Sequence, residues 1–273
     1  IDLSEQRQYA ISKVSGQNLI EALLNLCSLS SFYSEKELIA EIEEETRNFP
    51  LQNLFHGLKM NIDGEIIAKR PSILVDDEHI KNIALKNKLF EKISFCQGLD
   101  VYGFIEPARA KIVQESSPRL IEILVLAKDS PFIPEGREIS FAKGLHSGLI
   151  GDFLTSTSIL IPQFENAIRK IFEQRRVIIS SLREDDIQEK YDLNRLLPTN
   201  DCRKIFGTDQ TNYMISLLIN RFGSNLRNRV AHGLMTHNEY HQFDTIYFWW
   251  LTLRLCMIHY AIRSQAAKNS PTQ

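Results

Sequence analysis

The sequence predicts a mainly α-helical protein, in which an N-terminal helical region with one β-hairpin is followed by a helical bundle from about residue 130. Apolar residues recur at three- and four-residue spacing along most of the chain, which is the period of an amphipathic helix. One stretch near residue 60 departs from this period and contains an Asp-Gly pair, which is typical of a tight hairpin turn. No segment repeats at a period of 20 to 50 residues, which argues against a solenoid.

The composition is that of an ordinary globular protein, with 273 residues, 43% hydrophobic and 24% charged. The formal net charge is −2, so any contact with nucleic acid must come from a local positive patch. Acidic residues are concentrated between residues 35 and 45. This acidic cluster and the basic cluster in the second half of the chain can each also be explained as a solvated helix face. Basic residues cluster in the second half of the chain, at Arg169, Lys170, Arg175, Arg176, Arg221, Arg227 and Arg229.

The chain shows no feature of a membrane or secreted protein. No apolar run approaches the roughly 18 to 20 residues that cross a bilayer, and the first residues show no signal-peptide pattern. The four cysteines are far apart and form no C-x-x-C pair, so we expect reduced, buried thiols. We therefore expect a cytoplasmic protein without a membrane span.

The first 70 residues predict two helices and the hairpin. Residues 3–30 have helical periodicity, and Ser34-Glu35-Lys36-Glu37 resembles a capping box that opens a second helix, with Pro50 just past its end. Residues 58–69 predict the hairpin, with its reversal at Ile62-Asp63-Gly64. We interpret this hairpin as a structural flap.

Residues 76–114 predict a long helical stretch, with breaks at Gly98 and Gly103 and a last helix that starts at Pro107. Another apolar helix is expected over residues 118–128. Residues 130–136 contain two prolines and one glycine, which cannot continue either neighbouring helix. We place a domain boundary there, between residues 1–129 and residues 130–273.

The second domain predicts further helices. Gly144, Gly148 and Gly151 would share one face of a helix over residues 141–159 and let another backbone approach closely. Pro162 would open the next helix, which continues to Ile179. The remaining expectations are a short charged segment over residues 185–197, a helix over residues 209–219 ended by Gly223, and a last helix to about Arg263 with a capping box at Thr236-His237-Asn238-Glu239.

A polar cluster, Leu226-Arg227-Asn228-Arg229-Val230-Ala231-His232-Gly233, lies between two apolar helices. Arginine can hold a phosphate with a rigid fork of donors, and histidine can move a proton near neutral pH. The spacing R-x4-H is weak by itself, because Arg254 and His259 repeat it in an apolar helix. There, side chains five residues apart point about 140° away from each other. We interpret His259 as structural.

The surroundings of the first pair differ. Gly223-Ser224-Asn225 predicts a loop and helix cap, and Gly233 permits a chain reversal. On a helix from Leu226, the apolar Leu226, Val230 and Leu234 would share one side, with Asn228, Arg229 and His232 on the other and Arg227 nearer the N-terminus. A phosphate at this helix start could meet Arg227, Arg229 and His232 together. The alternative is a capped turn with exposed basic residues.

The string from Gly223 to Leu234 resembles the R-(N/D/H)-x-x-x-H signature of HEPN domains, the higher-eukaryote and prokaryote nucleotide-binding helical bundles. More specifically, it resembles a HEPN-type family that includes the endoplasmic-reticulum-membrane-associated RNA degradation protein. A second block of that family resembles Pro131-Phe132-Ile133-Pro134-Glu135-Gly136-Arg137, Lys143-Gly144-Leu145, Gly151-Asp152-Phe153, and Pro162-Gln163-Phe164-Glu165-Asn166 with Arg169. The resemblance covers residues 130–234 well and residues 1–129 more loosely.

The resemblance implies a HEPN-like bundle and a metal-independent endoribonuclease that uses no cofactor. In such enzymes the RNA 2′-hydroxyl attacks the scissile phosphate, which leaves a cyclic phosphate and a 5′-hydroxyl. The implied roles are phosphate binding for Arg227, proton transfer for His232 and orientation of His232 for Asn228, with Arg229 as a second phosphate contact suggested by the helix pattern. Such domains commonly form homodimers with two motifs facing one cleft, and stress or anti-phage defence is the expected setting.

Several other residues have two interpretations. Asp152 is expected to cap the following helix, or to accept a bond from the motif arginine. Glu165 and Arg169 are expected to form an ion pair, with a supporting role near the site as the alternative. His237 and His241 could chelate a metal but lack a third ligand, so we expect a solvated pair and no metal site. Of the adjacent Trp249 and Trp250, we expect one in the core and one at a dimer seam, with base stacking as an alternative.

Two rival functions stay open. A non-catalytic HEPN module could bind RNA or a nucleotide, or scaffold a protein partner through its dimer face. A purely structural dimerisation domain would neither bind nor cleave RNA.

Overall fold

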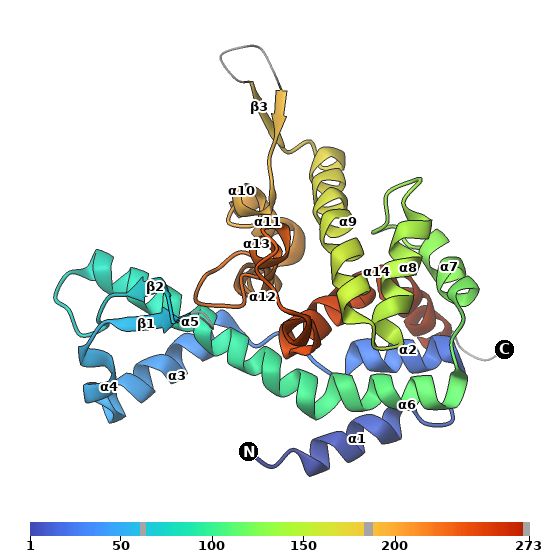
Figure 1. Ribbon diagram of the computed structural model, residues 1–273, viewed down its shortest axis with the longest axis horizontal. Coiled ribbons are helices and arrows are strands. Elements are labelled where there is room, and N and C mark those ends of the chain that lie inside the picture. The colour runs from blue at the N-terminus through green and yellow to red at the C-terminus, as the bar shows by residue number, and fades with distance from the viewer. Residues whose placement is uncertain (61–63, 183–187, 270–273) are drawn as a thin grey trace. The chain divides into compact units, whose positions relative to one another are not determined.

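Helices make up most of the chain, as the sequence predicts, in a computed structural model that describes residues 1–60, 64–182 and 188–269 (Figure 1). The residues form two compact units, and both are built from separated segments of the chain. The first unit comprises Ile1–Ser31, Gln97–Asp192 and His232–Gln273. The second comprises Phe32–Cys96 and Leu193–Ala231.

The first unit is centred on its last helix, α14, which packs against α2, α7, α8 and α9. Trp249 and Trp250 of α14 are both fully buried. The Trp249 indole N–H donates to Leu145 O of α8 at 2.9 Å, and the Trp250 indole N–H donates to Leu26 O of α2 at 3.0 Å. The helices of this unit are α1 (Ser4–Val14), α2 (Leu19–Ser28), α6 (Glu106–Ser116), α7 (Leu120–Lys128), α8 (Glu138–Leu149), α9 (Phe153–Gln174), the 3₁₀ helix η2 (His237–His241) and α14 (Phe243–Asn269).

Two glycines of α8 allow a close approach, but side chains approach them rather than the other backbone that the sequence predicted. A Cβ atom on Gly144 would lie 2.5 Å from Leu160 Cγ of α9, and one on Gly148 would lie 2.2 Å from Trp249 Cδ1. Gly151 does not share this helix face, because it has φ +94° in the turn between α8 and α9. Glycine is needed there for its backbone conformation rather than for packing.

Pro162 does not open a helix, contrary to prediction, but lies inside α9. Proline removes one backbone N–H from the helical ladder, so a helix interior normally excludes it. Here its neighbours Leu160, Ile161 and Phe164 are buried. We attribute the continuity of α9 to this packing, which outweighs the local cost.

Two expectations about helix breaks in the first half are wrong. Residues 3–30 form two helices, because Gly16 has φ +69° in the turn between α1 and α2. Conversely, α5 (Glu78–Asp100) passes through Gly98, where a Cβ atom would make only ordinary contact with the Phe243 ring. The chain then continues through a π-helical turn, η1 (Val101–Ile105), which contains Gly103, into α6. Pro107 lies in the first turn of α6, as predicted.

The second unit contains α3 (Glu35–Asn48), α4 (Pro50–Leu54), most of α5, α10 (Leu193–Leu196), α11 (Asn200–Phe206), α12 (Thr208–Leu218) and α13 (Leu226–Ala231). The helix after Ser34 forms, but Ser34 makes no side-chain cap. The Asp209 carboxylate replaces it and accepts the Glu35 N–H at 2.8 Å. Asn212 then donates to the Glu35 carboxylate at 2.9 Å. These bonds join α3 to α12, which the sequence separates by 160 residues or more.

The predicted hairpin is confirmed as β1 (Gly57–Met60) paired antiparallel with β2 (Ile66–Arg70). Its predicted turn lies largely outside the described residues, which omit residues 61–63. A second antiparallel pair, β3 (Ser180–Leu182) with β4 (Gln188–Lys190), was not predicted, and the charged segment expected from residue 185 lies partly outside the described residues.

The compact units divide the chain at other places than residue 130. Residues 130–136 lie inside the first unit, where Phe132 and Ile133 are buried. The Phe132 ring contacts the rings of Phe141 and Phe164 at centroid distances of 6.1 and 5.7 Å. The apolar residues between the two prolines therefore anchor this segment in a core to which α8 and α9 contribute.

All four cysteines are buried and free, as predicted. Burial raises the pKa of Cys27 to about 12 and that of Cys202 to about 11, so these thiols stay protonated at neutral pH. Across the described helices, none is both long and apolar enough to cross a membrane.

A buried carboxyl group lies where η1 begins. Asp100 is 5% exposed, and the Ser30 hydroxyl donates to its Oδ2 at 2.7 Å. Arg254 Nη1 donates to Ser30 O at 2.6 Å, and the Arg254 guanidinium lies over the Trp250 ring. Burial raises the pKa of Asp100 from 3.8 to about 6, although Ser30 and Arg254 act in the opposite direction.

The Gly148→Ala substitution is expected to destabilise the protein, because the new Cβ would overlap the Trp249 ring. We expect a loss of roughly 1–3 kcal/mol in the free energy of unfolding, measured by urea denaturation. Ser147→Ala on the same helix is the matched control and should be near neutral. Equal stability of the two variants would contradict the close packing of α8 on α14.

The Asp100→Asn substitution is expected to change the pH dependence of stability. The raised pKa means that the folded protein binds the Asp100 proton more tightly than the unfolded chain does. The stabilisation of the fold by the proton on Asp100 is complete below about pH 4 and is lost as the pH rises to about 6. From pH 4 to pH 6 the wild type should lose roughly 2 kcal/mol relative to the variant, at about 1.4 kcal/mol per tenfold change in proton affinity. Parallel pH profiles from urea denaturation would contradict the assignment.

Candidate functional site

The loop before α13 is pressed against the end of α12. A Cβ atom on Gly223 would lie 2.0 Å from Ser216 O, so only glycine fits at this position. The Ser224 N–H donates to the same Ser216 O at 2.8 Å. Gly223 therefore serves close packing, whereas α12 already ends at Leu218.

The same loop is also fixed to the β1–β2 hairpin. Lys59 Nζ of β1 donates to Phe222 O at 3.2 Å and also to Gly223 O. Asn220 Oδ1 accepts the N–H groups of Phe222 and Gly223 at 2.8 and 3.3 Å. Bonds from a strand and from a side chain thus define the path of the chain into α13.

Arg227 and Asn228 belong to a hydrogen-bonded network at the start of α13. Arg227 Nη1 donates to Asn228 Oδ1 at 3.0 Å. Asn228 Nδ2 donates to Asn225 Oδ1 at 2.7 Å and to Asn194 Oδ1 at 3.2 Å. The described bonds of Asn228 therefore hold Arg227 and the helix start, whereas its expected role in orienting His232 stays a prediction.

Arg229 is half-buried, and its Nη1 donates to Ser224 O at 3.4 Å. This bond directs the guanidinium back toward the loop before α13. The helix has only six residues, so its dipole adds little and the side chains supply most of the positive charge.

His232 is exposed and directly follows α13 in the chain. Gly233 has φ +66°, which confirms the expected reversal. The boundary between the compact units falls between Ala231 and His232, so the second unit contains Arg227 and the first contains His232.

The expected apolar side of α13 is confirmed only in part. Leu226 is fully buried and Val230 is half-buried. Leu234 is 66% exposed and lies outside the helix, which ends at Ala231. The reversal at Gly233 ends the helical geometry that would have placed Leu234 above Val230.

The three residues with expected supporting roles lie in the first unit. Asp152 caps α9, because its Oδ1 accepts the Thr155 N–H at 3.0 Å. Glu165 and Arg169 form the predicted ion pair, and Arg169 Nε also donates to Tyr191 O at 3.0 Å. This pair therefore ties α9 to the chain that follows β4.

The two tryptophans do not divide between core and surface as expected. Both are fully buried, so neither is free to form a dimer seam or to stack on a base. The His237 and His241 rings lie 5.1 Å apart in an edge-on arrangement, and both residues are exposed. Within the described ranges, no three His, Cys, Asp or Glu side chains are grouped so that they could hold a metal ion.

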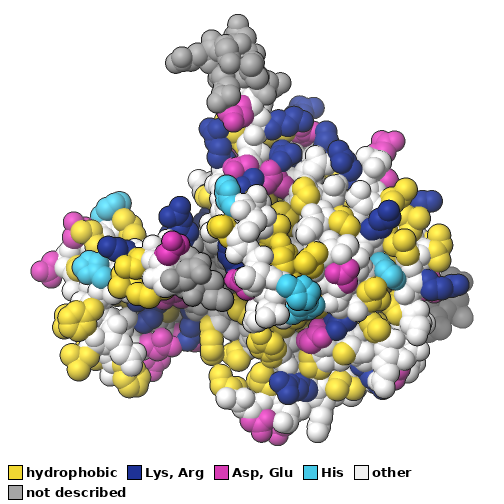
Figure 2. Space-filling view, viewed as in Figure 1, with side chains coloured by type: hydrophobic (Ala, Val, Ile, Leu, Met, Phe, Trp, Pro, Cys, Tyr) yellow, Lys and Arg dark blue, Asp and Glu magenta, His cyan; other side chains and the backbone are white. Residues whose placement is uncertain are grey.

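Positive side chains also gather in the first unit, near the C-terminal end of α9 (Figure 2). The exposed Arg175 and Arg176 follow this helix directly, and Lys170 pairs with Glu173 at 2.6 Å. The basic cluster seen in the sequence is thus divided between the two units, with Arg221, Arg227 and Arg229 in the second.

A groove that the sequence did not predict lies beside the loop before α13. It has a volume of about 390 Å³ and is lined by Ile67, Ala68, Lys69, Asn87, Ile219, Asn220, Arg221 and Phe222. The lining comes from β2, α5 and the loop after α12, which are distant in sequence. Arg221 was noted in the basic cluster, but no pattern in the sequence joins it to Lys69.

Comparisons with known proteins found no relative of this chain. No protein-family model, curated protein or solved structure matches the chain.

Asn225, in the network at the start of α13, has φ +50°. We therefore expect two substitutions at this position to lower the free energy of unfolding by different amounts. Asn225→Ala should lose the bond from Asn228 and place alanine in the left-handed region, at a cost of roughly 1–3 kcal/mol in the free energy of unfolding. Asn225→Gly tolerates the backbone conformation and should lose less. Urea denaturation checks the order, and equal losses in the two variants would show that the backbone conformation is unimportant.

Proposed function

We propose that this protein is a metal-independent endoribonuclease of HEPN type. One observation supports this function most directly: a short helix carries the bonded Arg227 in its first turn and is followed directly by the exposed His232. An arginine fork suits a phosphate, and an exposed imidazole can exchange protons near neutral pH. These groups suffice for acid–base cleavage of RNA.

The proposed reaction is an internal transfer within the RNA. The 2′-oxygen forms a bond to phosphorus as its proton leaves, and the bond from phosphorus to the 5′-oxygen breaks as that oxygen gains a proton. The products are a 2′,3′-cyclic phosphate and a 5′-hydroxyl. Arg227 holds the non-bridging oxygens as charge develops on them, and His232 transfers a proton.

The hydrogen bonds of Arg227 support its role. Asn228 Oδ1 accepts from Nη1, which restricts the guanidinium before the substrate arrives. Arg229 supplies a second positive charge on α13 and is proposed to hold a neighbouring phosphate of the strand.

The protein is proposed to act as a homodimer, in which two copies of the motif face one RNA strand. One His232 would then accept the proton from the 2′-hydroxyl while His232 of the second copy donates to the leaving oxygen. The buried free thiols suit the reducing cytoplasm as the site of action, in a stress or anti-phage response.

A non-catalytic RNA-binding module is the second candidate. It is favoured by the bonds of Asn228, which go to Asn194, Asn225 and Arg227 among the described residues. With Asn228 bonded to these partners, the positively charged α13 could bind a phosphate without orienting His232.

The decisive test replaces each motif residue. Arg227→Ala and His232→Ala should each lower the rate of RNA cleavage roughly 10²–10⁴-fold in the presence of EDTA, because each removes a group that acts in the transition state. Arg227→Lys should recover only part of the rate, since lysine keeps the charge but loses the planar fork. Cleavage of a labelled single-stranded RNA gives the rate, and the 2′,3′-cyclic ends identify the reaction.

Two exposed residues provide matched controls. His79→Ala and Arg47→Ala remove the same side-chain types from α5 and α3 and should leave the rate unchanged. Thermal melting verifies that the variants are folded. Wild-type rates in both motif variants would exclude the proposed enzyme, whereas salt-sensitive RNA binding without cleavage in the wild type would favour the second candidate.

A further inference from the structure

The groove beside the loop before α13 combines apolar, cationic and amide groups within the second unit. Its apolar part consists of Ile67, Ala68, Ile219 and Phe222. Its volume of about 390 Å³ falls within the range of roughly 300–1,000 Å³ that is typical of small-ligand sites. An open groove of this size can take one flat ring and its attached groups.

The charged residues that line the groove are positive. Lys69 and Arg221 are both exposed, and none of the described residues that line the groove is a carboxylate. Asn87 adds an amide from α5, and Asn220 is held in place by the two backbone N–H groups bonded to its Oδ1. A ligand with an anionic end and a polar, planar end matches these groups.

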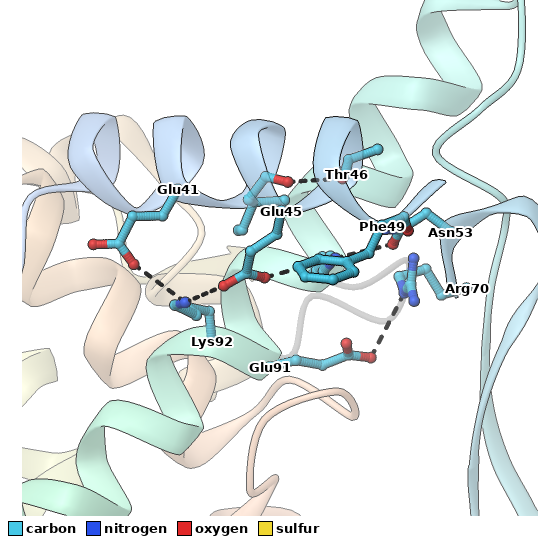
Figure 3. Close-up of polar contacts among 10 residues, drawn as sticks. Glu41, Glu45, Thr46, Phe49, Asn53, Arg70, Glu91 and Lys92 are labelled. Atoms are coloured by element: carbon cyan, nitrogen blue, oxygen red, sulfur yellow. Dashed lines mark hydrogen bonds and ion pairs between the residues drawn. The ribbon is translucent and has the colours of Figure 1, made fainter. Parts of the chain in front are cut away.

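A further positive side chain follows Lys69 on the same hairpin. Arg70 follows Lys69 on β2 and is 7% exposed, and its Nε and Nη1 have no hydrogen-bond partner among the described residues. Arg70 Nε lies 3.7 Å from Glu91 Oε1, beyond hydrogen-bond distance (Figure 3). Its side chain lies across Gly57, where a Cβ atom would come within 2.9 Å of Arg70 Nη2.

The carboxyl group nearest to Arg70 is that of Glu91 on α5. Burial raises the pKa of Glu91, while Arg70, Lys59 and Lys88 act to lower it. Three cations therefore influence the Glu91 carboxyl group electrostatically. The Glu45 carboxylate of α3 pairs with Lys92 at 2.6 Å (Figure 3). Lys88 lies 4.0 Å from the same carboxylate.

We propose that the groove binds one nucleotide of a single-stranded RNA. Its phosphate lies between Lys69 and Arg221, and its base lies against the apolar lining with an edge toward Asn87. This subsite rests on the proposed function for its ligand, because it would hold a nucleotide next to the one that is cleaved. Every group it uses lies in the second unit.

Chain continuity favours a nucleotide of a strand over an isolated small anion. Phe222 of the groove leads through Gly223-Ser224-Asn225 into α13, which carries Arg227 and Arg229. Lys59 fixes this connection from β1 through its bonds to Phe222 O and Gly223 O. A strand that leaves the groove along this loop reaches further arginines, as a repeating polyanion requires.

The test measures binding apart from cleavage. A 2′-O-methyl oligonucleotide lacks the attacking hydroxyl, so the unmodified protein can bind it without cutting it. Lys69→Ala and Arg221→Ala should each weaken binding roughly tenfold, as expected for a lost charge-assisted bond. The slope of log affinity against log salt should fall by about 0.7 for each phosphate contact removed.

The control variant is Lys36→Ala with Arg47→Ala, which removes one lysine and one arginine from exposed positions of α3. It should change neither affinity nor salt slope. A photoreactive 4-thiouridine in the oligonucleotide should form a covalent adduct with a groove residue such as Phe222, mapped by mass spectrometry. Unchanged binding in Lys69→Ala/Arg221→Ala, or adducts confined to other surfaces, would overturn the subsite.

The outcomes separate the subsite from the proposed enzyme. Loss of binding in the groove variants, with a wild type that never cleaves RNA, would keep the subsite and remove the enzyme. Cleavage that needs His232 but is indifferent to Lys69 and Arg221, in both rate and affinity, would keep the enzyme and remove the subsite.

Discussion

The first unit depends on how two adjacent tryptophans fix one helix. Trp249 and Trp250 project from α14 in different directions, and each satisfies its indole N–H with a carbonyl of a different helix, Leu145 O or Leu26 O. A buried indole must find such a partner, so the two bonds constrain α14 more strongly than apolar contact would. The absence of a side chain at Gly148 is the matching requirement on α8. Together these contacts join segments from the beginning, middle and end of the sequence.

The second unit uses polar bonds in a similar way, but near the surface. Lys59 connects the hairpin to the loop before α13, and Gly223 lets that loop contact Ser216. The position of Arg227 therefore depends on a strand more than 160 residues earlier in the chain. We interpreted the hairpin as a structural flap, but its Lys59 holds the loop that leads to the proposed phosphate site. The cations of the hairpin would act on a bound strand even where they do not touch it.

Local features of the fold were predictable from the sequence, because they depend on neighbouring residues. Pro107 marked the first turn of a helix, Asp152 marked a cap, and Glu165 with Arg169 marked an ion pair. The errors arose where distant packing decides the outcome. Pro162 is held inside a helix by a buried core, and Asp209 replaces the cap expected from Ser34.

The candidate site shows the same division. The short helix and the reversal at Gly233 follow from local sequence. The groove was not predictable, since no spacing rule links Lys69 with Arg221 before the fold brings them together. The hydrogen bond from Asn228 to Asn194 was also not predictable from the local pattern, because Asn194 lies 34 residues away in the sequence.

The interleaving of the two units has a consequence for the order in which the chain can fold as it is synthesised. The second unit needs residues up to Ala231, and the first cannot close before α14 has left the ribosome. Until then, the Leu26 and Leu145 carbonyls and the space beside Gly148 lack the indole rings that cover them. Long-range contacts of this kind slow folding and leave apolar surface open in the nascent chain.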